Sequence, residues 1–312
     1  MDPITDILVR RFGIAPADLR PHETQGNSSA AYRVARSGTD HLLRIHPSEE
    51  DAAALEYRMG LLEKLSRLGA PVVEPIRSPA GALVEVSGTR AATLLAIAPG
   101  RTHERLQCGS LPESLFHSLG KAIAELHRCA AGLPAKSAPE AWHEGDNCYN
   151  APEAGSFPDR EVAHRYDRLR AECLGRIPHG DEWWIIHGDL HFSNILLDPA
   201  SGRVTFCDFD DACLGFRDMD LAMVLFDLDV ILEGPTRGQD FPRLAGRILE
   251  GYREGSDGLV PTRMGIDPFV RLLEASLYIQ YHAYFTSLGE PDPEDWLTRF
   301  FAGRRERILS ED

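Results

Sequence analysis

The run His187-Gly-Asp-Leu-His-Phe-Ser-Asn194, followed by Asp208-Phe-Asp-Asp211, constrains this chain of 312 residues more than any other feature. It places a carboxylate at Asp189, an amide at Asn194 and a second carboxylate at Asp208. Carboxylate and amide oxygens are hard ligands of the kind that Mg²⁺ takes, with substrate phosphates completing its shell. The motif therefore predicts a site that holds a divalent metal and aims a hydroxyl at a phosphoryl group.

The residues around this motif predict strands. The apolar run 183–186 is typical of a buried strand that leads into the motif. Residues 195–197 and 203–207 predict two more strands, and Pro, Ser and Gly within 198–202 predict the turn between them. The polar residues of the motif then lie on the loops before and after this hairpin, where we expect them to converge on one edge.

The offset from Asp189 to Asn194 equals that in the protein-kinase catalytic loop, and Asp208-Phe-Asp210 stands where those kinases have Asp-Phe-Gly. With His-Gly-Asp-Leu-His-x-x-Asn, the chain more closely resembles the superfamily of aminoglycoside phosphotransferases, choline kinases and type II homoserine kinases. The resemblance implies an α+β, two-lobe protein-kinase-like fold. Residues 1–98 would form a nucleotide-binding lobe with a small antiparallel sheet and one main helix, and 99–312 a larger, mostly helical lobe with the catalytic loop and acceptor site.

The resemblance also implies roles for individual residues. Asp189 would be the catalytic base, and Asn194 and Asp208 would be the Mg²⁺ ligands. Asp220, in Asp218-Met-Asp-Leu-Ala222, would be a buried carboxylate that steadies the catalytic loop.

Three neighbouring residues have supporting interpretations. His187 and His191 could ligate a metal, but such histidines more often hold a loop through hydrogen bonds to backbone carbonyls, which is the interpretation we favour. Asp210 either assists the metal or caps the segment that follows.

Protein kinases use a strand lysine to contact phosphates, but this chain has lysine only at positions 64, 121 and 136. Arg44, within the predicted strand 41–45, matches the lysine position of the family, and its fork suits phosphate. Glu56, on a predicted helix over 49–68, is the candidate to orient Arg44, with Glu63 as the alternative. The polar loop 25–29 offers backbone amides to phosphate at Gly26, Asn27 and Ser28, or is an ordinary hairpin turn.

Apolar spacing predicts the remaining elements. We expect strands at 30–34, 71–76, 82–86 and 93–97, a hinge at 98–101, a long loop over 133–158, and helices at 3–13, 115–130, 160–175, 218–233, 240–254, 268–289 and 293–309. The helix 115–130 contains Ala-Glu-Leu-His127, which also resembles the family. On the helix 268–289, four aromatic residues line an acceptor pocket or, as is more usual for such a stripe, form core: Tyr278, Tyr281, Tyr284 and Phe285.

Composition limits the partners. The net charge of −15 disfavours nucleic acids and anionic membranes. No apolar run approaches the roughly 20 residues of a membrane span, and the first residues lack the pattern of a secretory signal. The six cysteines form no Cys-x-x-Cys pair, which argues against zinc and for a reducing cytoplasm.

The sequence therefore predicts an ATP- and Mg²⁺-dependent phosphotransferase that phosphorylates a hydroxyl of a small molecule, such as an amino alcohol, a sugar or an aminoglycoside. Asp-Phe-Asp-Asp-Ala212 also resembles the bacterial stress-response kinases, which keeps a protein Ser/Thr kinase open. A metal-dependent hydrolase that uses His187, Asp189, His191 and Asp208 is the alternative from another class. A nucleotide-binding regulator without activity is a further alternative.

Overall fold

The computed structural model describes residues 3–22, 30–36, 38–47, 52–102, 111–133, 140–145, 147–175, 184–232, 237–256, 263–287 and 296–310. It divides into two compact units. The first consists of Met1–Gly100 with Thr205–Asp210, and the second of Arg101–Val204 with Asp211–Asp312. Each unit is described by itself.

The first unit contains an antiparallel sheet of five strands in the order β1-β2-β3-β5-β4. The strands are β1 (Arg20–Pro21), β2 (Ala30–Arg36), β3 (Thr39–His46), β4 (Val84–Ser87) and β5 (Arg90–Ala96). The central strand β3 pairs with β2 on one side and with β5 on the other, so that Arg44 lies opposite Ala31 and Thr93. Arg44 is thereby fixed in the middle of the sheet.

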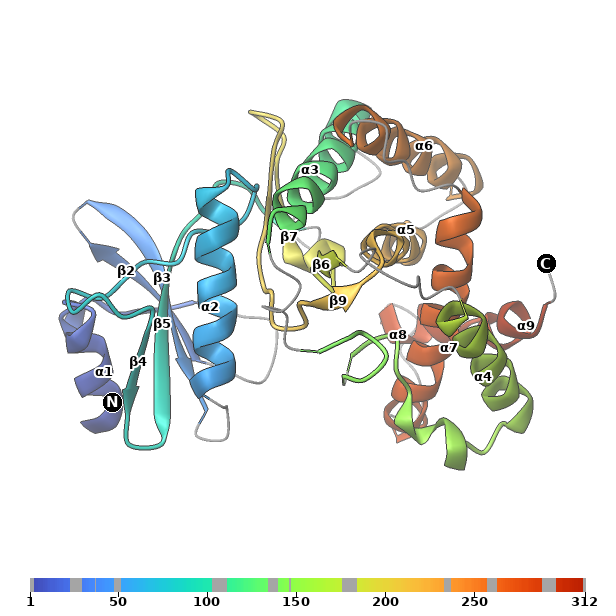
Figure 1. Cartoon of the computed structure of the whole chain (residues 1–312), viewed down its shortest axis with the longest axis horizontal. Coiled ribbons are helices and arrows are strands. Elements are labelled where there is room, and N and C mark those ends of the chain that lie inside the picture. Colours follow the sequence, from blue (N-terminus) through green and yellow to red (C-terminus); the bar gives the residue numbers. More distant parts are fainter. Residues whose placement is uncertain are drawn as a thin grey trace. The chain divides into compact units, whose positions relative to one another are not determined.

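Two helices lie on opposite sides of this sheet, α1 (Pro3–Arg11) and α2 (Ala52–Arg67) (Figure 1). Successive side chains of a strand alternate between the faces. Leu43 and Ile45 of β3 pack with Leu8 and Phe12 of α1 in one buried cluster. Arg44 therefore points to the face of the sheet that does not carry this cluster.

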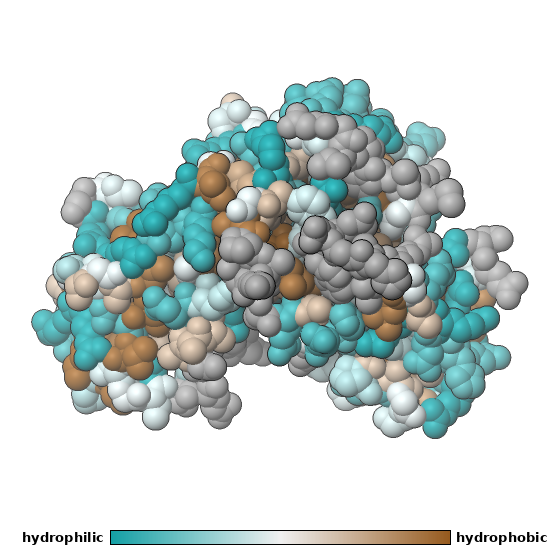
Figure 2. All heavy atoms as spheres, in the orientation of Figure 1, coloured by the Kyte–Doolittle hydropathy of each residue, from teal (hydrophilic) through white to brown (hydrophobic). Residues whose placement is uncertain are grey.

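The second unit is mainly helical. Its α-helices are α3 (Glu113–Ala131), α4 (Arg160–Leu174), α5 (Arg217–Ile231), α6 (Arg237–Gly255), α7 (Arg263–Ser287), α8 (Trp296–Phe301) and α9 (Arg304–Leu309). α3 packs along α6, and α7 packs against both α4 and α5 (Figure 1). On the face that Figure 2 shows, hydrophilic residues dominate the outer side of α3 and α6. Among the described residues, no helix is both long and apolar enough to cross a membrane.

Short strands surround the motif. β6 (Trp184–Ile186) pairs antiparallel with β9 (Cys213–Gly215). A 3₁₀ turn, η6 (Phe192–Asn194), leads directly into the hairpin of β7 (Ile195–Asp198) and β8 (Arg203–Phe206). Two further 3₁₀ turns are η1 (Pro16–Asp18) and η5 (Pro152–Ser156). The strand β9 was not predicted, because its three residues are too short to show a pattern.

Several predicted bounds are wrong for identifiable reasons. Residues 71–76 form no regular strand and contribute only isolated bridges, Val72 to Phe206 and Pro75 to Leu95. α7 begins before 268, because it accommodates Pro268 within the helix. The predicted helix 293–309 is two helices, and they are separated at Gly303, whose φ of 65° is left-handed.

Candidate functional site

The catalytic loop runs from the end of β6 to η6, and Gly188 is its tightest point. Gly188 has a φ of 83°, and a Cβ there would lie 2.1 Å from the carbonyl oxygen of Asp211. Both the positive φ and the close approach exclude a side chain. The glycine of His-Gly-Asp therefore lets the loop pass against the backbone at the end of the second motif.

Asp220 on α5 holds the first part of this loop. Its carboxylate accepts hydrogen bonds from the backbone N–H groups of His187 and Gly188, each at 3.0 Å. Nε2 of His127 lies 3.0 Å from the same carboxylate, and Asp220 is only 1% exposed. Burial raises the pKa of Asp220, but the hydrogen bond and charge of His127, with those of His187, lower it to below its ordinary value.

Two further residues, Tyr252 and Asp227, support the loop and were not predicted from the sequence. Nδ1 of His127 lies 2.9 Å from the hydroxyl of Tyr252 on α6, so α3, α5 and α6 meet at Asp220. Asp227 accepts a hydrogen bond from the backbone N–H of Phe192 at 2.6 Å. Asp227 follows Asp220 by two turns of α5, and this spacing of seven on one helix face is the signal that sequence reasoning could have used.

Asp189 is partly exposed and lies between two polar neighbours. Nδ2 of Asn194 is 3.3 Å from its Oδ2, and Nε2 of His191 is also 3.3 Å from that atom. Nδ1 of His191 accepts from the N–H of Ser193, so in the neutral ring the proton is on Nε2 and faces Asp189. Burial raises the pKa of Asp189, but His191, the charge of His187 and the bond from Asn194 outweigh it, and the pKa lies below its ordinary value.

The two histidines bond to the backbone of the loop, but the described bonds are accepted from N–H groups, whereas bonds to carbonyls were predicted. His187 is fully buried, and its Nδ1 accepts a hydrogen bond from the backbone N–H of Asp189 at 3.4 Å. His191 caps η6 through the bond to Ser193. One nitrogen of each ring therefore accepts a hydrogen bond from the backbone of the loop.

Asn194 is well suited to a cation. Its Nδ2 donates to the backbone carbonyl of Asp189 at 2.9 Å as well as to the carboxylate. This pattern assigns the orientation of the amide and directs Oδ1 away from Asp189. Asn194 is only 8% exposed, so its side chain is held in place. Its carboxamide oxygen is a hard ligand of the kind that Mg²⁺ takes, as are the carboxylates of Asp208 and Asp210 in the first unit.

The first unit carries the other half of the predicted site. Nη1 of Arg44 lies 3.2 Å from Oδ1 of Asp208, and its Nη2 lies 3.7 Å from Oδ2 of Asp210. Arg58 on α2 is 3.4 Å from the other oxygen of Asp210. Asp208 has a φ of 61°, the one positive φ of a non-glycine residue among those described. Such a conformation costs energy and is typical of functional turns.

The predicted role of Glu56 is wrong in this structure. Among the described residues, Glu56 makes no ion pair with Arg44, and its side chain is exposed on α2. Glu63 instead binds Arg77 through both oxygens at 2.7 Å. Among the described acidic residues, Asp208 and Asp210 lie within ion-pair distance of Arg44. Gly26, Asn27 and Ser28 lie outside the described residues.

The aromatic residues of α7 differ in burial, and the predicted acceptor pocket stays a prediction. Tyr278 is buried and belongs to the core, whereas Phe285 is partly buried and stacks on Phe301 at 4.3 Å between ring centroids. Tyr281 is 38% exposed. Burial raises its pKa, and the nearby carboxylates of Asp189 and Asp211 raise it further. Tyr281 is therefore the aromatic of this stripe that lies near the catalytic loop.

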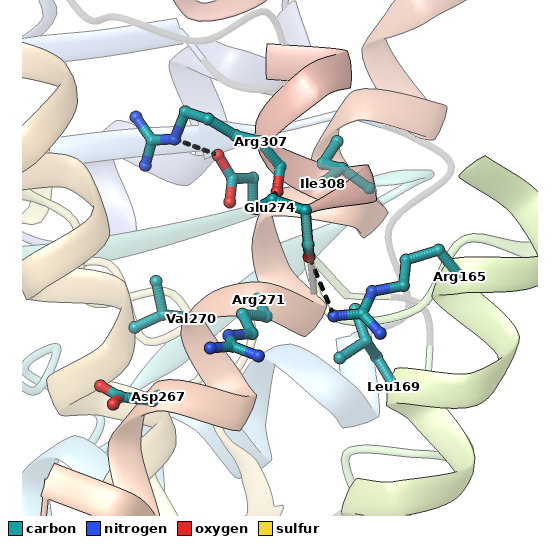
Figure 3. Close-up of a pocket in the computed structure, with 9 residues that line it drawn as sticks. Arg165, Leu169, Asp267, Val270, Arg271, Glu274, Arg307 and Ile308 are labelled. Carbon is teal, nitrogen blue, oxygen red and sulfur yellow. Dashed lines mark hydrogen bonds and ion pairs between the residues drawn. The ribbon is translucent and has the colours of Figure 1, made fainter. Parts of the chain in front are cut away.

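A cavity of about 210 Å³ opens between α4, α7 and α9, away from the motif (Figure 3). Its polar side chains bind one another: Arg307 lies 3.3 Å from Glu274, and Arg165 donates to the carbonyl of Ser310 at 3.4 Å. None of its lining residues belongs to the motif. The cavity marks the packing of α9 onto α4 and α7 and is not the predicted site.

Comparison with known proteins decides the family. A family model described as "Phosphotransferase enzyme family" matches residues 18–260, more than half of the chain. The chain belongs to the phosphotransferase enzyme family. The match covers Arg44 and the whole of the run from His187 to Asp211, so the motifs that predicted phosphoryl transfer lie within the family's own region.

Curated relatives in this family are distant. A homoserine kinase of Chelativorans sp. is 27% identical over 213 residues, which are 64% of this chain and 61% of that protein. The chain thus spans about three fifths of the length of the homoserine kinase. An aminoglycoside 3'-phosphotransferase of Streptomyces ribosidificus is 28% identical over 248 residues, 74% of this chain and 89% of the relative.

Solved structures in the comparison share the fold. An amicoumacin kinase in complex with AMP-PNP and Ca²⁺ has a TM-score of 0.75 at 19% identity and covers 95% of this chain and 91% of its own. A microcompartment-associated aminopropanol kinase has a TM-score of 0.69 at 18% identity, over 98% of this chain and 94% of its own. These matches confirm the predicted α+β, protein-kinase-like fold.

Proposed function

We propose that this protein is an ATP- and Mg²⁺-dependent phosphotransferase that moves the γ-phosphate to a hydroxyl of a small-molecule acceptor. The observation that carries the proposal is the held carboxylate of Asp189. The pKa of Asp189 is below its ordinary value, and the loop that carries it is held by hydrogen bonds from its backbone to buried Asp220. Family membership favours phosphoryl transfer over the hydrolase alternative.

Asp189 acts on the acceptor in this proposal. In phosphoryl transfer the protein takes little part in covalent chemistry, and most of the catalysis comes from positioning the reactants and stabilising charge. An ionised carboxylate accepts the proton of the acceptor hydroxyl, or orients it, as the hydroxyl approaches the phosphorus. Nε2–H of His191 and Nδ2 of Asn194 keep the carboxylate oriented for that task.

Arg44, Asn194 and Asp208 act on the nucleotide. Asn194 and Asp208 would supply oxygen ligands to Mg²⁺, which when bound neutralises the charge of the phosphates. Arg44 would grip the phosphates that are not transferred through its planar fork. In this structure Arg44 pairs with Asp208 and Asp210, so its guanidinium is already held in place by carboxylates.

A small-molecule acceptor is favoured over a protein. The named relatives and structural neighbours are kinases of homoserine, aminoglycosides, amicoumacin and aminopropanol. In addition, α5 begins at Arg217, only six residues after Asp211, which leaves no room for the long activation segment of protein kinases.

The test combines one substitution with an acceptor screen. Wild-type protein with Mg²⁺-ATP is assayed over amino alcohols, sugars, aminoglycosides and a protein substrate. Asp189→Asn should then lower kcat by about 10²–10⁴-fold, the usual contribution of a general base, while the Kd of Mg²⁺-ATP stays within about twofold. Asp240→Asn, which replaces a partly exposed carboxylate on α6 that pairs with Arg243, is the matched control. Full activity of Asp189→Asn would contradict the proposal, as would a wild-type protein that transfers phosphate to none of these acceptors.

A further inference from the structure

A short segment outside the motif, residues 147–150, contacts the catalytic loop, and we call it the clamp segment. Sγ of Cys148 donates a hydrogen bond to the backbone carbonyl of Gly188 at 3.3 Å. The hydroxyl of Tyr149 donates to the backbone carbonyl of Met219 at 2.6 Å. These two carbonyls belong to the residues directly before the proposed base and directly before its buried anchor. The clamp segment therefore bonds to both parts of the machinery.

Gln280 on α7 fastens the clamp segment. Its Nε2 donates to the carbonyl of Asn150 at 2.8 Å and lies 2.9 Å from Oγ of Ser276, one turn earlier on the helix. The carbonyls of Asn147 and Cys148 are each 3.3 Å from the same nitrogen. Since an amide group has two hydrogens, the longer contacts share them with the shorter ones. Three carbonyls of the clamp segment thus converge on one side chain.

The clamp segment is also bonded to the residues just before it and within itself. Nδ2 of Asn150 donates to the carbonyls of Trp142 and Gly145, each at 2.6 Å. Oδ1 of Asn147 accepts from the N–H of Tyr149 at 2.9 Å. Trp142 itself is fully buried. Because its backbone is bonded on several sides, the clamp segment can pass the position of α7 on to the catalytic loop.

Cys148 has the protonation state that this role needs. Only a thiol carries the hydrogen that the Gly188 carbonyl accepts, and a thiolate would repel that oxygen. Burial raises the pKa of Cys148 well above its ordinary value, and the carboxylates of Asp189 and Asp211 raise it further. The side chain is therefore a donor at neutral pH.

We propose that Gln280 and Cys148 are positioning residues for phosphoryl transfer. Gln280 holds the clamp segment, and Cys148 fixes the carbonyl of Gly188. That carbonyl shares a rigid peptide plane with the backbone N–H of Asp189, so fixing one end sets the direction in which the base leaves the loop. The catalytic meaning of this inference rests on the proposed function, whereas the hydrogen-bonded path from α7 to the loop does not.

The first test uses Gln280→Leu, which keeps the bulk of the side chain and removes its donors. Two quantities are measured: the kcat and KM of Mg²⁺-ATP turnover, with water as acceptor where no other has been found, and amide hydrogen exchange of a peptide over 185–195. We expect kcat to fall about tenfold with KM for ATP within about twofold, and exchange in this peptide to accelerate. Gln239→Leu, at an exposed position on α6, should leave both unchanged.

The second test separates the hydrogen bond from packing. Cys148→Ala removes the donor and should lower kcat about threefold, because a thiol is a weak donor. Cys148→Ser keeps a donor and should recover most of that loss. Cys129→Ala, on α3, is the control for loss of a buried thiol.

Two outcomes would overturn the inference: unchanged exchange over 185–195 in Gln280→Leu, or equal kcat for Cys148→Ala and Cys148→Ser. The exchange measurement needs no substrate. A wild-type protein without phosphotransfer would therefore refute the proposed function and leave the path from α7 to the catalytic loop to be judged by exchange alone.

Discussion

Asp220→Asn gives the sharpest test of how the catalytic loop is held. The carboxylate of Asp220 accepts three hydrogen bonds, and its two backbone donors are adjacent: Oδ1 faces the N–H of Gly188, and Oδ2 faces the N–H of His187 and Nε2 of His127. Asparagine has the same shape but only one oxygen. In either orientation of the amide, its NH₂ group faces one of the two backbone N–H groups, so one buried donor loses its acceptor.

The expected cost follows from this geometry. Leaving one buried donor unsatisfied costs about 1–3 kcal/mol. The other two bonds lose the assistance of the charge, which accounts for roughly half of the about 1.5–3 kcal/mol that each contributes. His127 can change its tautomer and accept from the new NH₂ group, which limits the loss on that side. We expect a net loss of about 3 kcal/mol in the free energy of unfolding of the second unit.

Calorimetry and hydrogen exchange measure this loss. With about 2–4 °C per kcal/mol for domains of about 150–250 residues, the transition of the second unit should fall by roughly 6–12 °C. Exchange at the amides of His187 and Gly188 should accelerate. Asp229→Asn, on the same helix, weakens the pair with Arg307, whose side chain is 47% exposed, and should cost less stability than Asp220→Asn. If Asp220→Asn were as stable as Asp229→Asn and exchanged equally slowly, the anchoring role would be refuted.

Four other outcomes are expected. Gly188→Ala should abolish turnover, because its Cβ would lie 2.1 Å from the carbonyl oxygen of Asp211, and calorimetry will show whether the fold also loses stability. The lowered pKa of Asp189 keeps it ionised, so protonation of this group should cause no fall in kcat/KM above about pH 4. A fall in kcat/KM near pH 6 that is caused by protonation of Asp189 would contradict this. The lowered pKa of Asp220 stabilises the fold above its unfolded-state pKa of about 4, and that stability should be lost as pH falls further, which acid titration of wild type against Asp220→Asn will measure. Arg44→Gln should raise the Kd of Mg²⁺-ATP about tenfold or more by calorimetric titration, since charge-assisted bonds to phosphate are lost, and an unchanged Kd would remove Arg44 from the site.

Elements with strong local signals were predictable. The apolar spacing of residues 115–130 and 160–175 gave helices that match α3 and α4 to within two residues at each end. The catalytic loop was recognisable because its polar residues stand at fixed offsets between apolar runs. These features depend on periodicity and on turn-forming residues, which neighbouring positions alone determine.

Pairing between distant residues was less predictable. Both glutamates of α2 were candidates to meet Arg44 of β3, and the sequence could not tell that Glu63 would instead bind Arg77, which lies beyond the helix. Likewise, nothing local marks Gln280 as the partner of a segment 130 residues earlier. Such contacts depend on which helix face the core covers, and that choice is made by the whole unit at once.

The sequence by itself predicted the kind of chemistry that this protein performs. Asp189, Asn194 and Asp208 carry the oxygens that we propose for phosphoryl transfer, and a family model over residues 18–260 places the chain in the phosphotransferase enzyme family. Only the tertiary structure decided which residues hold the catalytic loop in place. The backbone of the catalytic loop bonds to residues that are far from it in sequence, because a loop without regular structure cannot pair its own N–H and C=O groups. Buried Asp220 and Asp227, both on α5, accept hydrogen bonds from its N–H groups, and the clamp segment donates one to its carbonyl at Gly188.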